Sequence, residues 1–294
     1  MADRYGPVEF ESGPGRVRRA SVSDIPVARP IAATPSATGL RCDHPFLLGS
    51  AQRSRVWADV ALVAFAVVTL DVVVGTVLHM LAFPSDALAD IPEPAVKHAL
   101  FAPMLASRVI VIALSVTAIL WCRGQTLASI GLVSSGVVVD VLVGVAATAV
   151  AYALSFSWQL LVWTVWPGLL DQMSENAQRI MRLVPNPGSP VRFVPVALAV
   201  GVYEELLFRG FLMTRLRRGM GSWAGAVIVS TGVFTALHGV DQTAAALIPV
   251  AILSSVFSLT TIWRRSLLPA VVGHSLFNLI SFLVLYFTAE SNWV

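Results

Sequence analysis

The chain has 294 residues, of which 56% are hydrophobic and only 13% are charged, with a formal net charge of +3 at pH 7. Soluble domains carry about 25% charged residues, so this composition excludes an ordinary soluble protein. The hydrophobic residues form runs near the ~20 residues that cross a bilayer, whereas a membrane barrel would show ~10-residue alternating strands. We therefore predict an all-α polytopic helix bundle that contacts lipid, and we expect no nucleic-acid partner.

The first 56 residues are rich in Arg, Pro, Ser and Ala and contain no apolar run. This composition predicts a disordered cytoplasmic arm rather than a packed domain. Its arginines either contact anionic lipid or are simply solvated, and both interpretations stay open.

The remainder, residues 57–288, is predicted to be one transmembrane domain. It contains about seven apolar spans, near residues 57–82, 98–121, 136–165, 191–213, 222–240, 243–263 and 267–288. Between the third and fourth spans, apolar residues recur at helical spacing over residues 169–184, with a polar opposite face. That pattern predicts an interfacial helix, which is either a passive surface helix or a lid.

Arginine clusters mark one side of the predicted membrane. They precede the first span and follow the fourth and sixth spans, and the single Arg123 follows the second, whereas most acidic loop residues lie in the alternate loops. The positive-inside rule then places the N-terminus in the cytoplasm and the C-terminus outside. The Ala-, Val-, Arg-, Gly- and Pro-rich composition, with Lys97 as the only lysine, hints at a GC-rich bacterial gene. We therefore expect a multi-pass protein of the bacterial inner membrane.

Two adjacent carboxylates lie inside the fourth span, at Glu204 and Glu205, followed by Arg209. Each carboxylate at membrane depth costs roughly 2.5–3.5 kcal/mol on insertion scales, so the presence of two indicates that they have a function. Glu205 and Arg209 are four residues apart and share a helix face, where they can pair. Glu204 points about 100° away and is free to face another group.

Two other spans carry motif residues at the same spacing: Phe234 and His238 on the fifth, and His274 and Asn278 on the seventh. A carboxylate beside a histidine can activate water, and a histidine with an amide can stabilise an oxyanion. Equally, a zinc ion could be held by Glu204, His238 and His274 with water in the fourth position. The metalloprotease pattern His-Glu-x-x-His is absent.

The ordered motifs Glu-Glu-x-x-x-Arg, Phe-x-x-x-His and His-x-x-x-Asn resemble those of the CAAX protease and bacteriocin-processing family (CPBP, or Abi). These membrane-embedded proteases are related to the ras-converting endopeptidase, and the resemblance covers about residues 190–285. It implies that Glu204 with His238 activates water and that His274 with Asn278 stabilises the oxyanion. It also implies that Glu205 and Arg209 form a supporting ion pair beside Phe234.

The resemblance favours an intramembrane endopeptidase that acts on a membrane-anchored or amphipathic polypeptide, with activated water preferred over zinc. Two alternatives stay open: a non-catalytic scaffold or immunity protein that binds a peptide, and a proton-coupled transporter, although no inverted repeat is visible.

The predicted depths of the candidate residues in the membrane disagree with their meeting in one site. At ~1.5 Å per residue, Glu204 and His274 lie about 14 and 10 Å from the inner edge, but His238 lies near 24 Å. Either the fifth span is tilted or starts deeper, or its boundaries are wrong. The shallow Glu204 and His274 predict a site that opens toward the cytoplasm.

Outside the motifs, Asp71 and Arg108 have matched depth on the first two spans, which predicts a buried structural ion pair. Asp59, His79 and Asp140 lie near span ends and are predicted to be interfacial.

Overall fold

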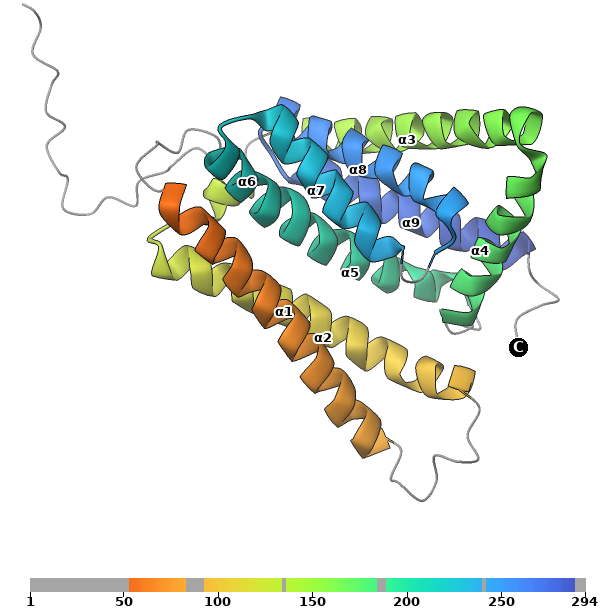
Figure 1. Cartoon of the computed structure of the whole chain (residues 1–294), viewed down its shortest axis with the longest axis horizontal. Coiled ribbons are helices and arrows are strands. Elements are labelled where there is room, and N and C mark those ends of the chain that lie inside the picture. The colour runs from red at the N-terminus through yellow and green to blue at the C-terminus, as the bar shows by residue number, and fades with distance from the viewer. Residues whose placement is uncertain (1–52, 83–92, 134–135, 184–188, 240–241, 289–294) are drawn as a thin grey trace, which may run out of the picture. The chain divides into compact units, whose positions relative to one another are not determined.

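The computed structural model describes residues 53–82, 93–133, 136–183, 189–239 and 242–288, and within these residues it contains helices and no strand (Figure 1). The predicted arm therefore lies almost wholly outside the described residues. The all-α prediction is confirmed for the described part.

Five helices of the described residues are long and apolar enough to cross a membrane. They are α1 (Arg53–Ala82), α2 (Glu93–Cys122), α3 (Val137–Val165), α8 (Ala244–Arg264) and α9 (Leu268–Thr288). This makes the chain a multi-pass membrane protein.

The count of seven spans is not reproduced at the predicted fourth and fifth spans. The fourth consists of three consecutive helical pieces: α5 (Phe193–Glu205), the π-helix η7 (Leu206–Leu212) and α6 (Met213–Met220). The fifth, α7 (Trp223–His238), has 16 residues and is about 24 Å long, less than the ~30 Å hydrocarbon core.

Close contact between backbones sets the distance from α5 to α9. A Cβ atom added at Gly201 would lie 2.2 Å from Ser275 Oγ and 2.8 Å from the Ser275 backbone nitrogen. Small residues allow this approach between membrane helices. Since Glu204 follows Gly201 by three residues and His274 directly precedes Ser275, the contact brings an acidic and an imidazole side chain together.

The amphipathic segment forms the helix α4 (Leu170–Leu183), preceded by the short 3-10 turn η5 (Pro167–Leu169). It is joined to the start of α8 through Thr243, whose backbone nitrogen donates to Asn176 Oδ1 at 3.1 Å. The Thr243 hydroxyl donates to the Gln172 carbonyl at 3.0 Å. The predicted helix is therefore present, and it covers the N-terminal end of α8. A second 3-10 turn, η6 (Pro190–Arg192), follows α4 in the chain and leads into α5.

Arginine–aspartate pairs gather at the end of the bundle opposite α4. Arg123 donates two hydrogen bonds to Asp59, and Arg215 Nε lies 3.6 Å from the same carboxylate. Arg264 donates to Asp140 at 2.8 Å. Both aspartates are buried, which corrects the prediction that they are exposed to interfacial water: each carboxylate pairs with an arginine instead, although Asp140 Oδ2 has no hydrogen-bond partner. The side chain of His79 lies outside the described part.

Burial makes Arg215 unusual within this group. Desolvation, followed by repulsion from Arg218, lowers the pKa of Arg215 to about 10, although Asp59 opposes the shift. Arg215 consequently still carries its positive charge at pH 7, and Asp59 is its counter-ion. The short 3-10 turn η4 (Leu127–Ile130) packs nearby, because Leu267 donates its backbone N–H to the Gly131 carbonyl at 2.8 Å.

The predicted pair of Asp71 and Arg108 is also present. Arg108 donates from Nε to Asp71 Oδ1 at 2.8 Å and from Nη2 to Oδ2 at 3.2 Å. The two side chains are 45% and 28% exposed, so the pair is not buried as predicted. The matched depth of the two residues correctly predicted that they pair. It gave no information on how closely other helices cover α1 and α2, so it could not predict the burial of the pair.

Candidate active site

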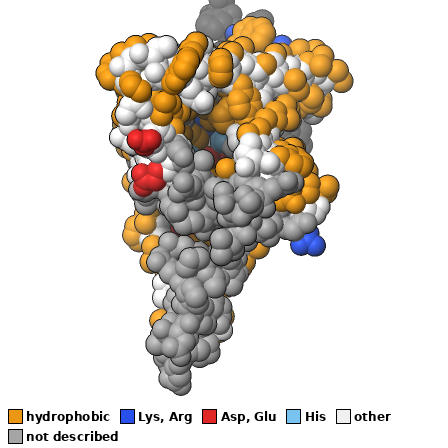
Figure 2. Space-filling model, turned by 90° about the vertical axis from the view of Figure 1, so that its right-hand side faces the viewer, with side chains coloured by type: hydrophobic (Ala, Val, Ile, Leu, Met, Phe, Trp, Pro, Cys, Tyr) orange, Lys and Arg blue, Asp and Glu red, His pale blue; other side chains and the backbone are white. Residues whose placement is uncertain are grey.

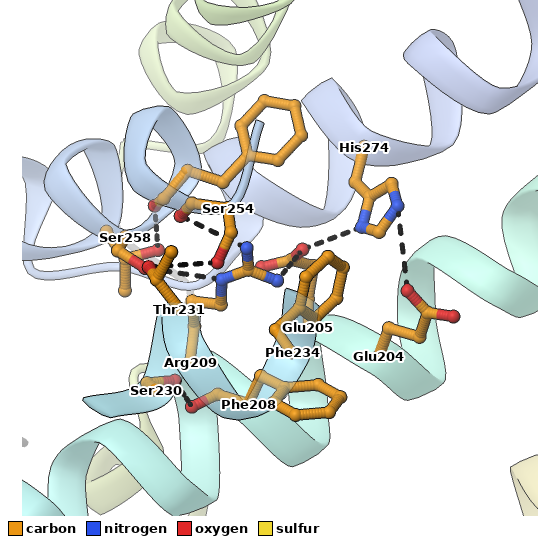
Figure 3. A network of polar contacts seen from close by, with 12 residues as sticks. Glu204, Glu205, Phe208, Arg209, Ser230, Thr231, Phe234, Ser254, Ser258 and His274 are labelled. Carbon is orange, nitrogen blue, oxygen red and sulfur yellow. Dashed lines mark hydrogen bonds and ion pairs between the residues drawn. The ribbon is translucent and has the colours of Figure 1, made fainter. Parts of the chain in front are cut away.

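A fully buried ion pair lies at the centre of the polar cluster (Figure 3). Arg209 Nη1 donates to Glu205 Oε1 at 2.7 Å, and neither side chain is exposed. The rest of the guanidinium is held by α8, through the Ser254 carbonyl at 3.1 Å and Ser258 Oγ at 3.4 Å. Its carbon lies 4.6 Å from the centre of the Phe234 ring. The cation is therefore fixed on several sides.

His274 approaches the same carboxylate oxygen from α9. Its Nδ1 lies 2.7 Å from Glu205 Oε1, and its ring stacks on Phe257 at 5.7 Å between centres. A carboxylate paired with arginine accepts hydrogen bonds, so Nδ1 carries the proton of this contact. Nε2 of His274 is consequently the nitrogen that faces Glu204 Oε2, 3.7 Å away.

The last residue of α7 supplies the second imidazole. His238 Nδ1 lies 2.8 Å from the Phe234 carbonyl oxygen, which can only accept, so Nδ1 is protonated. Nε2 therefore has a free lone pair in the neutral ring, and it lies 4.0 Å from Glu204 Oε2.

The structure brings His238 to Glu204 in spite of the depth conflict, because His238 Nε2 lies 4.0 Å from Glu204 Oε2. The helix α7 begins at Trp223 and ends at His238, within two residues of the predicted fifth span, so its boundaries do not account for the conflict. A fifth span that is tilted or starts deeper in the membrane stays a prediction.

Glu204 is the least satisfied carboxylate of the cluster. Its Oε1 accepts from the Tyr203 hydroxyl at 3.0 Å, whereas its buried Oε2 has no hydrogen-bond partner. The separations of 3.7 and 4.0 Å from the two imidazoles are too long for direct hydrogen bonds. Each of these separations is short enough for one water with ~2.8 Å hydrogen bonds to bridge the carboxylate oxygen and the imidazole nitrogen. The geometry thus provides a position for a water between one carboxylate and two imidazoles.

Asn278 lies one turn beyond His274 on α9 and is half-buried. Its side chain makes no hydrogen bond with any described residue. The structure thus brings together Glu204, Glu205, Arg209, His238 and His274. The oxyanion role of Asn278 stays a prediction.

A carboxylate and two imidazoles form a donor set that suits zinc. In the described part of the chain, however, no three His, Cys, Asp or Glu side chains are arranged to hold a metal ion. Zinc ligation by Glu204, His238 and His274 stays a prediction, and no chemical step is assigned to a metal.

A hollow connects the cluster with one end of the bundle. Figure 2 views the side on which α4 lies in Figure 1 and shows the hollow with histidine at its floor. His238 is 25% exposed, compared with 10% for Glu204 and 4% for His274. The opening lies at the end opposite the arginine–aspartate pairs, whereas the sequence predicted an opening on the arginine-rich side.

Several groups that complete the cluster were missed in the sequence. Tyr203 directly precedes Glu204, and neighbours in a helix normally diverge, so helical spacing did not indicate a contact. Ser254 and Ser258 are four residues apart on α8, and this polar stripe was the available signal for the groups that bind Arg209. Ser254 also donates to Thr231 Oγ1 at 3.1 Å, which links α8 to α7.

Comparison with known proteins supports the assignment of this segment. Residues 186–280 match a family model described as type II CAAX prenyl endopeptidase Rce1-like. No curated protein and no solved structure matches the chain. The matched residues include all three motifs and every residue of the polar cluster described above. The segment that builds the site is therefore similar to the Rce1-like type II CAAX prenyl endopeptidases, in agreement with the family resemblance of the motifs.

Proposed function

We propose that this protein is an intramembrane endopeptidase in which Glu204 activates water for attack on a peptide bond. The observation that supports this proposal is the unpartnered Glu204 Oε2 facing Nε2 of both His238 and His274. An unsatisfied buried carboxylate oxygen is costly, and a bridging water removes that cost.

The water has a suitable partner for each of its hydrogen bonds. It donates to Glu204 Oε2 and to the lone pair of His238 Nε2. His274 presents Nε2 to the same position from α9. These contacts hold the water oxygen close to where a substrate carbonyl carbon would lie.

The reaction then needs two proton movements. Glu204 takes one proton as the water oxygen bonds to the carbonyl carbon, which gives a tetrahedral oxyanion. His274 and the Asn278 amide supply donors to that oxyanion. As the C–N bond breaks, Glu204 returns the proton to the leaving amine, so the acid and base roles fall on one carboxylate.

The substrate we propose is a membrane-anchored or amphipathic polypeptide. The matched family is named for prenylated CAAX ends, but the site as described contains no feature that requires a prenyl group. The hollow at the α4 end and the apolar surface of the long helices suit a chain that is held at the membrane.

The test compares processed peptides in membranes that contain the active protein or its Glu204→Gln variant. We expect a set of new peptide termini to depend on Glu204, while the variant inserts and folds normally. The control is Glu175→Gln, which neutralises an exposed glutamate on α4 and should leave the termini unchanged.

Other outcomes discriminate the alternatives. Biological activity that survives Glu204→Gln without any change in termini would indicate a peptide-binding scaffold or immunity protein. Proton-driven uptake into liposomes, without cleavage, would indicate a transporter.

A further inference from the structure

A second chain of polar contacts reaches Glu204 from the side of α1 and α2. Arg108 is held by two hydrogen bonds to Asp71, at 2.8 and 3.2 Å. The same guanidinium interacts with the Tyr203 hydroxyl, and that hydroxyl lies 3.0 Å from Glu204 Oε1. Three helices that are distant in sequence are thereby linked to one oxygen of the carboxylate.

The direction of each hydrogen bond in this chain is fixed by the chemistry of its members. Arginine has donors only, so in its interaction with Arg108 the Tyr203 oxygen can act only as the acceptor. The single phenolic proton of Tyr203 is then available for Glu204 Oε1, since a carboxylate accepts. Neighbouring bonds in such a chain polarise and strengthen one another.

We propose that Tyr203, oriented by the Arg108–Asp71 pair, is a positioning residue that turns the Glu204 carboxylate toward the two histidines. Occupation of Oε1 leaves Oε2 as the oxygen that faces His238 and His274. Without Tyr203, the carboxylate rotates about its terminal torsion, which has no sharp preference. This inference rests on the proposed function, because it concerns the base of that reaction.

Packing explains why the tyrosine can act in this way. Its ring packs against the hydrophobic cluster that includes Val63 of α1 and Ile112 and Val116 of α2. Tyr203→Phe keeps the ring and this packing and removes only the hydroxyl. A matched control is Tyr152→Phe, which removes a hydroxyl bonded to the Phe277 carbonyl and Ser281 Oγ at 2.8 Å, away from Glu204.

The experiment uses the purified full chain in lipid nanodiscs and a synthetic peptide that spans the strongest Glu204-dependent cleavage site. We expect Tyr203→Phe to lower kcat by roughly tenfold to a hundredfold with KM unchanged, as misplacement of a catalytic group does. Tyr152→Phe should retain the wild-type kcat.

A double-mutant comparison tests the role of the ion pair. Asp71→Asn with Arg108→Gln removes both charges together, so neither is left unpaired. We expect this pair variant to lower kcat in the wild-type background and to cause no further loss in the Tyr203→Phe background.

The possible results separate this inference from the proposed function. A wild-type kcat in Tyr203→Phe, or losses that simply multiply when the variants are combined, would overturn the positioning role while Glu204→Gln remains inactive. If no terminus depends on Glu204, the proposed function fails and the inference fails with it. If Tyr203→Phe does not fold, the variant that combines Asp71→Asn with Arg108→Gln tests the proposal alone. An unchanged kcat in that variant would overturn the positioning role.

Discussion

Glu205 Oε1 lies 2.7 Å from His274 Nδ1, and the same oxygen accepts from Arg209. One carboxylate oxygen therefore neutralises a buried cation and also fixes the orientation of an imidazole. Structural support and site geometry cannot be separated at this residue.

Replacing Glu205 by Gln should damage both roles. Loss of one partner of a buried ion pair typically costs 3–5 kcal/mol, because the remaining charge is uncompensated. We expect a large decrease in the thermal unfolding temperature in detergent, together with loss of cleavage.

The double variant Glu205→Gln with Arg209→Gln should recover part of this stability, since no buried charge is left alone. It should not recover cleavage, because His274 still lacks its carboxylate. Recovery of both properties would show that the pair is dispensable for the site.

The approach of α5 to α9 provides a second prediction. Gly201→Ala would place a Cβ 2.2 Å from Ser275 Oγ, so the helices must separate. We expect overpacking to cost about 1–3 kcal/mol and to lower kcat as Glu204 moves away from His274. Thermal unfolding and cleavage assays would measure the two effects.

Gly232→Ala is the matched control, because a Cβ there meets no atom within 4 Å. It should be neutral or stabilise α7 by roughly 0.5–1 kcal/mol, since alanine is the better helix former. Equal destabilisation by the two variants would contradict the packing argument.

Chelation distinguishes activated water from a metal mechanism. Because the described residues contain no group of three ligands with metal-binding geometry, we expect dialysis against EDTA to leave Glu204-dependent cleavage unchanged. Loss of cleavage that zinc restores would favour ligation by Glu204, His238 and His274 instead.

Cys122 can test the predicted orientation. It is exposed at the end of α2, next to Arg123 in the arginine-rich end. In a Cys42→Ser background, a membrane-impermeant maleimide should label Cys122 in inside-out vesicles and not in intact cells. The reverse result would invert the predicted topology.

Helical spacing predicted the contacts that depend only on helix geometry. The Glu205–Arg209 pair follows from its spacing of four on one helix. The meeting of Glu204, His238 and His274 was expected from the three ordered motifs, and it depends on how α5, α7 and α9 pack. Hydrophobic length, in contrast, did not show where α7 ends, because Val240 continues the apolar run beyond His238.

Contacts between neighbouring or distant residues were harder to predict. The hydroxyl of Tyr203 reaches Glu204 because the ring packs against α1 and α2, and no spacing rule encodes that. The burial of Asp59 and Asp140 likewise depends on how arginines from later helices fold over them.

The recess at one end of the bundle has a consequence for the membrane as a whole. Hydrolysis needs water at depth, but a pore across the bilayer would dissipate the ion gradient that a cell maintains. A recess that opens at one end only, with the Arg123–Asp59 and Arg264–Asp140 pairs packed at the other, would admit water as a blind well and leave the permeability barrier intact.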